Sequence, residues 1–156
     1  PFVLLAPEKT HSTEVQKVNG DIVCNGIINS AREALEAGIP VGLGTDSSCP
    51  YVTHYDMWRE VAYFAKYAGV SNAFALHTAT QVNAGLLGLG DVTGTVEVGK
   101  DADLLAVAGD PLVDLSALRA PLHVMARGKL ADKLKVKHIG ELDRELDWIL
   151  DQPVER

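Results

Sequence analysis

Asp46 is the residue whose type and position best suit chemistry. It directly follows Pro40–Thr45, an apolar run typical of a buried parallel strand, and catalytic groups gather at the C-terminal ends of such strands. If strand alternation continues, Asp46 shares a face with Gly42 and Gly44, which leaves room for an ion or a substrate. A carboxylate there can bind a divalent metal or carry a proton between water and a leaving group. The local sequence supports equally an Asp that caps the following turn.

The histidines and cysteines show no metal-binding spacing. The sequence contains no HxH pair, no HExxH motif and no CxxC pair. His54 lies in the loop after Asp46 and is a candidate substrate contact, although a lone loop histidine is more often an ordinary surface group. Cys49 has no histidine partner at a fixed spacing, which disfavours a thiol nucleophile. Asp46 is therefore predicted to be the one residue of this chain that serves the chemistry directly.

The elements that must position Asp46 have an α/β order. Phe2–Ala6 is a short apolar run that suits a buried strand, and residues 7–26 are polar and predict a loop. Apolar residues on one helical face predict a helix over residues 27–35, which Gly38 ends. With the strand at Pro40–Thr45, these segments predict a right-handed βαβ unit.

Residues 56–87 are predicted to be helical. The first helix covers Asp56–Ala68 and ends at Gly69. Ser71 can cap a further helix, and Thr80 with Asn83 offers a second cap, which predicts two short helices meeting at an angle.

After Gly88 the sequence is rich in short β-type stretches. Strands are expected at residues 95–98, 103–107, 122–127 and 130–136, and an amphipathic helix carries Leu142, Leu146, Ile149 and Leu150 on one face. These patterns divide the chain into an α/β unit at residues 1–90, a β unit at 91–137 and a terminal helix at 138–156.

Composition and net charge disfavour two classes of binding partner. The 156 residues include 14 Lys and Arg against 21 Asp and Glu, a net charge of −7. This acidic balance disfavours nucleic acid and anionic membranes as partners. The apolar runs are far shorter than the roughly 18 residues of a membrane span. Two cysteines without a disulfide framework predict a reduced, cytoplasmic compartment.

Several segments, in this order, resemble the metal-dependent amidohydrolase superfamily. Ile39–Asp46 resembles its last barrel strand, and Ala75–Gly88 resembles its "AL–AT–N–A–LG" helical segment. Gly94–Leu104 resembles its "G-T-hydrophobic-x-x-G-K-x-A-D-L" turn. Asp110–Leu112 and Val124–Lys129 resemble its closing strands. The resemblance covers about residues 2–129.

The resemblance implies a fold and an activity. Residues 1–90 would be the last two βα units of a (β/α)8 TIM barrel, residues 91–137 the C-terminal part of a small β-sandwich, and residues 138–156 an added helix. The family hydrolyses C–N bonds in small-molecule cyclic amides, ureas, amino-substituted rings and dipeptides with a water activated by divalent metal, often zinc. Asp46 matches the last-strand Asp that binds metal and moves the proton.

Within the family, two groups of members stay open. The Gly44-Thr45-Asp46-Ser47 start and the helix that begins at Asp56-Met57-Trp58-Arg59-Glu60 lean towards deaminases and chlorohydrolases. Gly109-Asp110-Pro111-Leu112 leans towards dipeptidases and imidazolonepropionases.

The departures from the family pattern are as informative as the matches. The HxH of the first strand, the bridging lysine or carboxylate and the later histidines are absent. We therefore expect a C-terminal fragment of a hydrolase, which by itself is metal-free at Asp46 and inactive. Unpaired strand edges would require a homo-oligomer or a missing N-terminal segment. The alternative is a non-catalytic α/β module that needs a partner chain.

Overall fold

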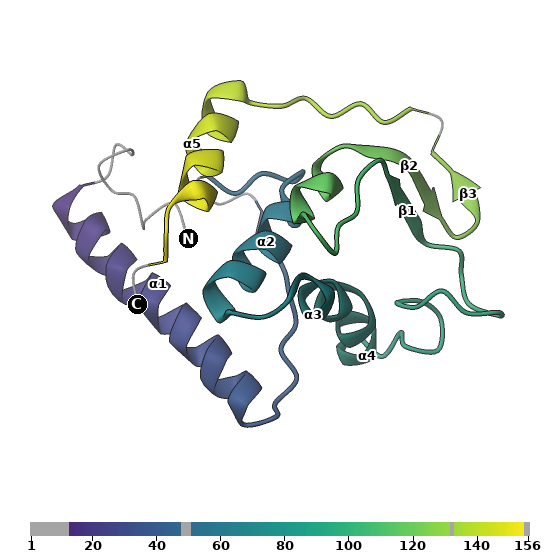
Figure 1. Cartoon of the computed structure of the whole chain (residues 1–156), viewed down its shortest axis with the longest axis horizontal. Helices are drawn as coiled ribbons and strands as arrows, with labels where there is room; N and C mark the ends of the chain where they lie inside the picture. The colour runs from purple at the N-terminus through teal and green to yellow at the C-terminus, as the bar shows by residue number, and fades with distance from the viewer. Residues whose placement is uncertain (1–12, 48–50, 132, 155–156) are drawn as a thin grey trace.

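The computed structural model describes residues 13–47, 51–131 and 133–154 and shows a mixed α/β arrangement. Helix α2 (Met57–Ala68) lies between α1 (Glu14–Glu36) and α5 (Gly140–Asp151) on one side and a small sheet on the other (Figure 1). The predicted strand at Phe2–Ala6 lies outside the described residues. No helix among the described residues is long and apolar enough to cross a membrane.

Helix α1 begins much earlier than the sequence indicated. Thr13 and Gln16 form a capping box, in which the Gln16 amide N–H donates to Thr13 Oγ1 at 3.3 Å and the Thr13 amide N–H donates to Gln16 Oε1 at 2.9 Å. The predicted loop is therefore wrong for residues 14–26, because this cap starts the helix there. The helix predicted over residues 27–35 is confirmed as its second half. Gly38, with φ of 72°, follows its end as expected.

Helix α2 matches its prediction and is buried on two faces. Val61 and Phe64 face one core cluster, whereas Tyr63 and Tyr67 face another. Gly69, with φ of 73°, ends the helix in the left-handed conformation that glycine adopts without strain. The helix is therefore the element that joins the two halves of the core.

The third helical region is one continuous run. Helix α3 (Asn72–His77) passes through a π-helical turn (Thr78–Val82) into α4 (Asn83–Leu86). Ser71 caps α3 as predicted, since its side chain accepts from the Phe74 amide. The second cap is wrong: the Thr80 hydroxyl donates to the Leu76 carbonyl at 2.7 Å, which keeps Thr80 inside the helix.

The described strands form one antiparallel sheet in the order β1 (Leu104–Val107), β2 (Pro121–Ala126), β3 (Lys129–Leu130). A short 3-10 helix, Leu115–Arg119, connects β1 to β2. Two predicted strands are thus confirmed. Residues 95–98 are not a strand, because positive φ angles at Gly94 and Gly99 turn the chain at both ends. The strand predicted at 130–136 is wrong for residues 131 and 133–136, and residue 132 lies outside the described residues.

Helix α5 confirms the predicted amphipathic helix and packs on α2. Leu146 and Ile149 are buried against Tyr63 and Tyr67. The Lys66 ammonium donates to the carbonyls of Ile149, Leu150 and Gln152 at the end of α5. Burial lowers the pKa of Lys66. The unit boundaries predicted near residues 90 and 137 stay predictions.

Candidate functional site

Asp46 lies at the end of an irregular segment, residues 39–46, between α1 and α2. The side chains of Val41 and Leu43 pack against the core cluster that contains Val61, Phe64 and Ala75. The predicted strand at Pro40–Thr45 is not paired with any strand among the described residues. Side-chain packing and one side-chain amide hold this segment in place.

The amide is that of Asn83, the first residue of α4. The Leu43 amide N–H donates to Asn83 Oδ1 at 2.8 Å, and Asn83 Nδ2 donates to the Leu43 carbonyl at 2.9 Å. The side chain therefore satisfies both backbone groups of Leu43, as a residue of a neighbouring strand would do. Asn83 Nδ2 also reaches the Ala79 carbonyl at 3.4 Å.

The backbone at Asp46 differs from the strand that the sequence predicted. Asp46 is exposed and has φ of 51°, a left-handed conformation that Asp tolerates better than most residues. Alternation therefore does not continue to Asp46. A Cβ at Gly42 would lie 2.9 Å from Asn83 Oδ1, so that position is filled by the helix, whereas Gly44 borders open space. The sequence predicted open space beside both glycines below the Asp46 carboxylate; the structure leaves that space open at Gly44 but not at Gly42.

His54 is exposed, and its ring contacts Tyr55 edge-on, with ring centroids 5.3 Å apart. Tyr55 in turn stacks at a tilt on His138, whose Nδ1 lies 3.0 Å from Asp143 Oδ2. The structure thus places His54 at the edge of an aromatic contact that leads to α5. Its role as a substrate contact stays a prediction. Cys49 lies outside the described residues.

The described residues do not by themselves make a metal site. Residues 13–47, 51–131 and 133–154 contain no group of three or more His, Cys, Asp or Glu side chains that could hold an ion. A catalytic zinc normally has three protein ligands, and Asp46 supplies one carboxylate. A divalent metal such as zinc therefore does not fit the described residues alone.

A second polar cluster joins α2 to α5. The Arg59 side chain, 2% exposed, donates to Asp56 at 2.8 Å and also pairs with Asp143 and Asp147. Burial lowers the pKa of Arg59, but the hydrogen bonds to Asp147 and Asp56 outweigh that effect, and the net pKa is raised. These groups are fully partnered and support the fold rather than a reaction.

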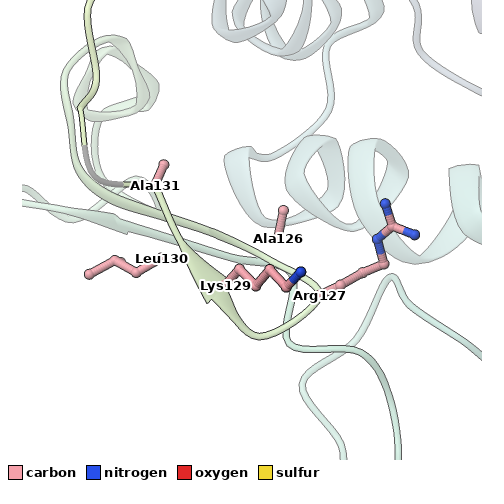
Figure 2. Close-up of a pocket in the computed structure, with 5 residues that line it drawn as sticks. All are labelled: Ala126, Arg127, Lys129, Leu130 and Ala131. Atoms are coloured by element: carbon pink, nitrogen blue, oxygen red, sulfur yellow. The ribbon is translucent and has the colours of Figure 1, made fainter.

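One surface hollow of about 550 Å³ lies at the β2–β3 hairpin, lined by Ala126, Arg127, Lys129, Leu130 and Ala131 (Figure 2). Figure 2 shows Arg127 and Leu130 pointing in opposite directions. The hollow lacks the convergent polar groups of a small-molecule site, and its lining includes neither Asp46 nor Asn83.

Sequence reasoning missed two residues that the structure brings to prominence. The sequence places Asn83 in a candidate helix cap and in the family-like segment Ala75–Gly88, but neither pattern predicts its pairing with Leu43. Arg59 lies within a predicted helix, and the sequence pattern gives no sign of its role, because two of its three acidic partners lie more than 80 positions away.

Known proteins match this chain over part of their length. The imidazolonepropionase of Thermoplasma volcanium is 36% identical over 86 residues, which are 54% of this chain and 21% of that protein. A crystal structure of a candidate prolidase from Bifidobacterium longum has a TM-score of 0.89 at 42% identity and covers 96% of this chain and 37% of its own. A Xaa-Pro dipeptidase with methionine bound in its active site has a TM-score of 0.71 at 30% identity, covering 85% and 32%.

The chain therefore spans between about a fifth and two fifths of the length of these relatives. The family model of the amidohydrolase family matches residues 19–131, a region that contains the segment ending at Asp46, the helical run with Asn83 and the antiparallel sheet. This match extends over more than half of the sequence and confirms the resemblance drawn from its motifs: the chain belongs to the amidohydrolase family.

Proposed function

We propose that this chain is part of a metal-dependent hydrolase that cleaves a C–N bond in a dipeptide-type substrate. Two structural relatives whose names concern prolidase or Xaa-Pro dipeptidase activity cover 96% and 85% of the chain. The imidazolonepropionase relative covers 54% and supports an imidazolone-type substrate as the second candidate. In this proposal, residues 1–90 supply the last βα units of a barrel and residues 91–137 supply part of a β-sandwich.

The observation that carries the proposal is the placement of Asp46. Its carboxylate is exposed at the end of a segment that two anchors hold, within the region that matches the family. An exposed carboxylate so held can take a proton from an attacking water and give it to the departing nitrogen. Because Asp46 provides a single metal ligand, the remaining ligands in this proposal come from polypeptide that this sequence does not contain.

The test uses the complete reading frame that encodes this chain, assayed with Xaa-Pro dipeptides and with an imidazolone substrate. Asp46→Asn should lower kcat by about 10²–10⁴-fold, the usual contribution of a proton-transferring group. The fold should persist, since Asn also tolerates a positive φ. Asp91→Asn, at an exposed position outside the site, is the matched control and should keep wild-type kcat.

Two results would contradict the proposal. One is Asp46→Asn activity equal to that of the control variant. The other is no hydrolysis of either substrate class, which would favour a non-catalytic module. In parallel, we expect the 156-residue chain alone to be inactive and metal-free after dialysis. About one equivalent of zinc, lost on Asp46→Ala, would show that this chain has ligands beyond those recognised in its sequence.

A further inference from the structure

The two hydrogen bonds between Asn83 and Leu43 form a clamp on the segment that carries Asp46. They join a helix residue to a backbone 40 positions earlier in the sequence. Their donor–acceptor distances, 2.8 and 2.9 Å, are those of well-formed N–H···O bonds, and both bonds are part-buried. An amide side chain supplies one acceptor and one donor side by side. An ionised Asp at position 83 would leave the Leu43 carbonyl without a donor, and Leu would leave both backbone groups of Leu43 without a partner.

A π-helical turn, Thr78–Val82, lies immediately before Asn83 in the helix. A π turn holds more residues per turn than an α turn, so it changes the direction in which the following side chains point. Such turns are uncommon and occur frequently at functional sites. Here the turn brings Asn83 onto the face that meets Leu43.

Close packing keeps the clamp in place. On the segment side, Gly42 leaves only enough space for Asn83, since a Cβ there would lie 2.9 Å from its Oδ1. Gly94 also sits against the helix, where a Cβ would lie 2.5 Å from Ala84 Cβ and 3.1 Å from the Thr80 carbonyl oxygen. The helix therefore has little freedom to move relative to residues 42 and 43.

We propose that Asn83 is a positioning residue, which fixes the backbone at Leu43 and thereby sets the direction of the Asp46 carboxylate three residues later. This inference rests on the proposed function of Asp46. The direction of the Asp46 side chain depends on its left-handed backbone and on the residues before it. If the Leu43 backbone is less firmly held, the Asp46 carboxylate therefore samples many orientations. A misplaced catalytic group loses rate more than substrate affinity.

The first test measures the clamp itself, in the protein expressed from the complete reading frame. Hydrogen exchange of a peptide covering residues 39–46 reports the Leu43 amide. In Asn83→Ala, its protection should fall about tenfold, the effect of losing roughly 1.4 kcal/mol of hydrogen bonding. Asn72→Ala is the matched control. It removes an amide that donates to Leu112 and Val113 carbonyls, and it should leave residues 39–46 protected.

A second variant separates the clamp from general damage to the fold. Asn83→Asp keeps the shape of the side chain but, when ionised, sets acceptor oxygens against the Leu43 carbonyl. Protonation of the introduced carboxyl restores a donor. The Leu43 amide keeps an acceptor in both protonation states, but at about pH 7 the carboxylate repels the Leu43 carbonyl oxygen and should push the segment off the helix. Protection of residues 39–46, corrected for intrinsic exchange, should therefore be low at about pH 7 and should rise towards pH 4. In Asn83→Ala it should stay low at both pH values.

The kinetic test asks whether the clamp positions Asp46. Asn83→Ala and Asn83→Asp should each lower kcat by about 10-fold or more with KM changed less than about threefold. Asn72→Ala should keep both constants. A merely structural Asn83 would instead lower the amount of folded enzyme and leave kcat per folded molecule unchanged.

The possible failures are distinguishable. Unchanged protection in Asn83→Ala, or deprotection with an unchanged kcat, overturns the positioning role while Asp46→Asn still abolishes turnover. If Asp46→Asn keeps full activity, the proposed function and the positioning role are both overturned, even where the exchange data show that the clamp exists.

Discussion

Arg59 illustrates how a single charged residue can be essential to the packing of two helices. Its side chain is 2% exposed, and the Asp56 and Asp143 side chains around it are 6% and 8% exposed. Its guanidinium also lies over the Trp58 ring, 4.6 Å from the ring centroid. Removing one member of such a cluster leaves buried charges without compensation.

We therefore expect Arg59→Met to lower the free energy of unfolding by about 3–5 kcal/mol. Denaturant unfolding of the wild-type chain and the variant measures the difference. The control is Lys17→Ala, which removes an exposed ion pair with Glu14 at 2.6 Å and should change stability by less than about 1 kcal/mol. Equal effects of the two substitutions would show that the buried cluster contributes no more than a surface pair.

Asp147 predicts how stability responds to acid. Burial raises its pKa, but hydrogen bonds from Arg59 and Arg119 outweigh this and hold the pKa of Asp147 below its ordinary value. A carboxyl whose folded pKa is depressed contributes stability above its unfolded pKa and loses it as pH falls through the folded value.

The wild-type chain should therefore lose stability as pH falls from about 5 towards 2, and Asp147→Asn should lose less over the same range. Chemical unfolding at a series of pH values measures both slopes. Identical slopes for the two proteins would contradict an ion-paired Asp147.

At the scale of elements, the helical run from α3 to α4 contacts both the segment that carries Asp46 and the loop at Gly94. Asn83, directly after its π turn, pairs with Leu43, and Gly94 packs against Thr80, Gln81 and Ala84. Gly94 needs both of glycine's properties, because its φ is 92° and its neighbours leave no room for a side chain.

Gly94→Ala should accordingly lower the free energy of unfolding by about 1–3 kcal/mol, from backbone strain together with the clash at Ala84. Gly99→Ala is a matched control, since Gly99 has φ of 97° but no atom within 4 Å of an added Cβ. It measures strain alone. Thermal unfolding should give Gly94→Ala a clearly lower melting temperature than Gly99→Ala. The reverse order would mean that the loop at Gly94 moves away from the helix.

At the scale of the whole molecule, apolar surface is unusually exposed. Val15, Val18 and Ile22 of α1 are 69%, 61% and 65% exposed. Leucines of the sheet are exposed as well, including Leu104, Leu105, Leu122 and Leu130. Monomeric proteins rarely leave such surfaces uncovered.

We expect the purified 156-residue chain to self-associate. Sedimentation velocity over a range of concentrations should show a rising mean mass, because exposed apolar surface is buried on association. A Val18→Lys, Ile22→Glu double variant should reduce association, whereas Asn25→Lys on the same helix should not. A compact monomer at every concentration would contradict this prediction.

The sequence alone determined the elements that depend on near neighbours. Ser71 caps α3, and Gly38 and Gly69 follow the ends of α1 and α2, because caps and left-handed stops act within a few residues. The same holds for the amphipathic face of α5. The ordered motifs from Ile39 to Lys129 identified the family, since their residue types and spacing are local properties of the chain.

Only the tertiary structure decided how these elements serve the candidate site. The Leu43 backbone pairs with an amide 40 residues away, and Arg59 with carboxylates of α5. The early start of α1 was missed because residues 14–26 are rich in polar and turn-forming residues and the capping box of Thr13 and Gln16 was not recognised. The residues predicted as a strand before Asp46 form an irregular segment, because a strand needs a neighbouring strand for its backbone hydrogen bonds and none of the described strands lies beside them. Such contacts arise when distant segments meet, and a one-dimensional pattern does not record them.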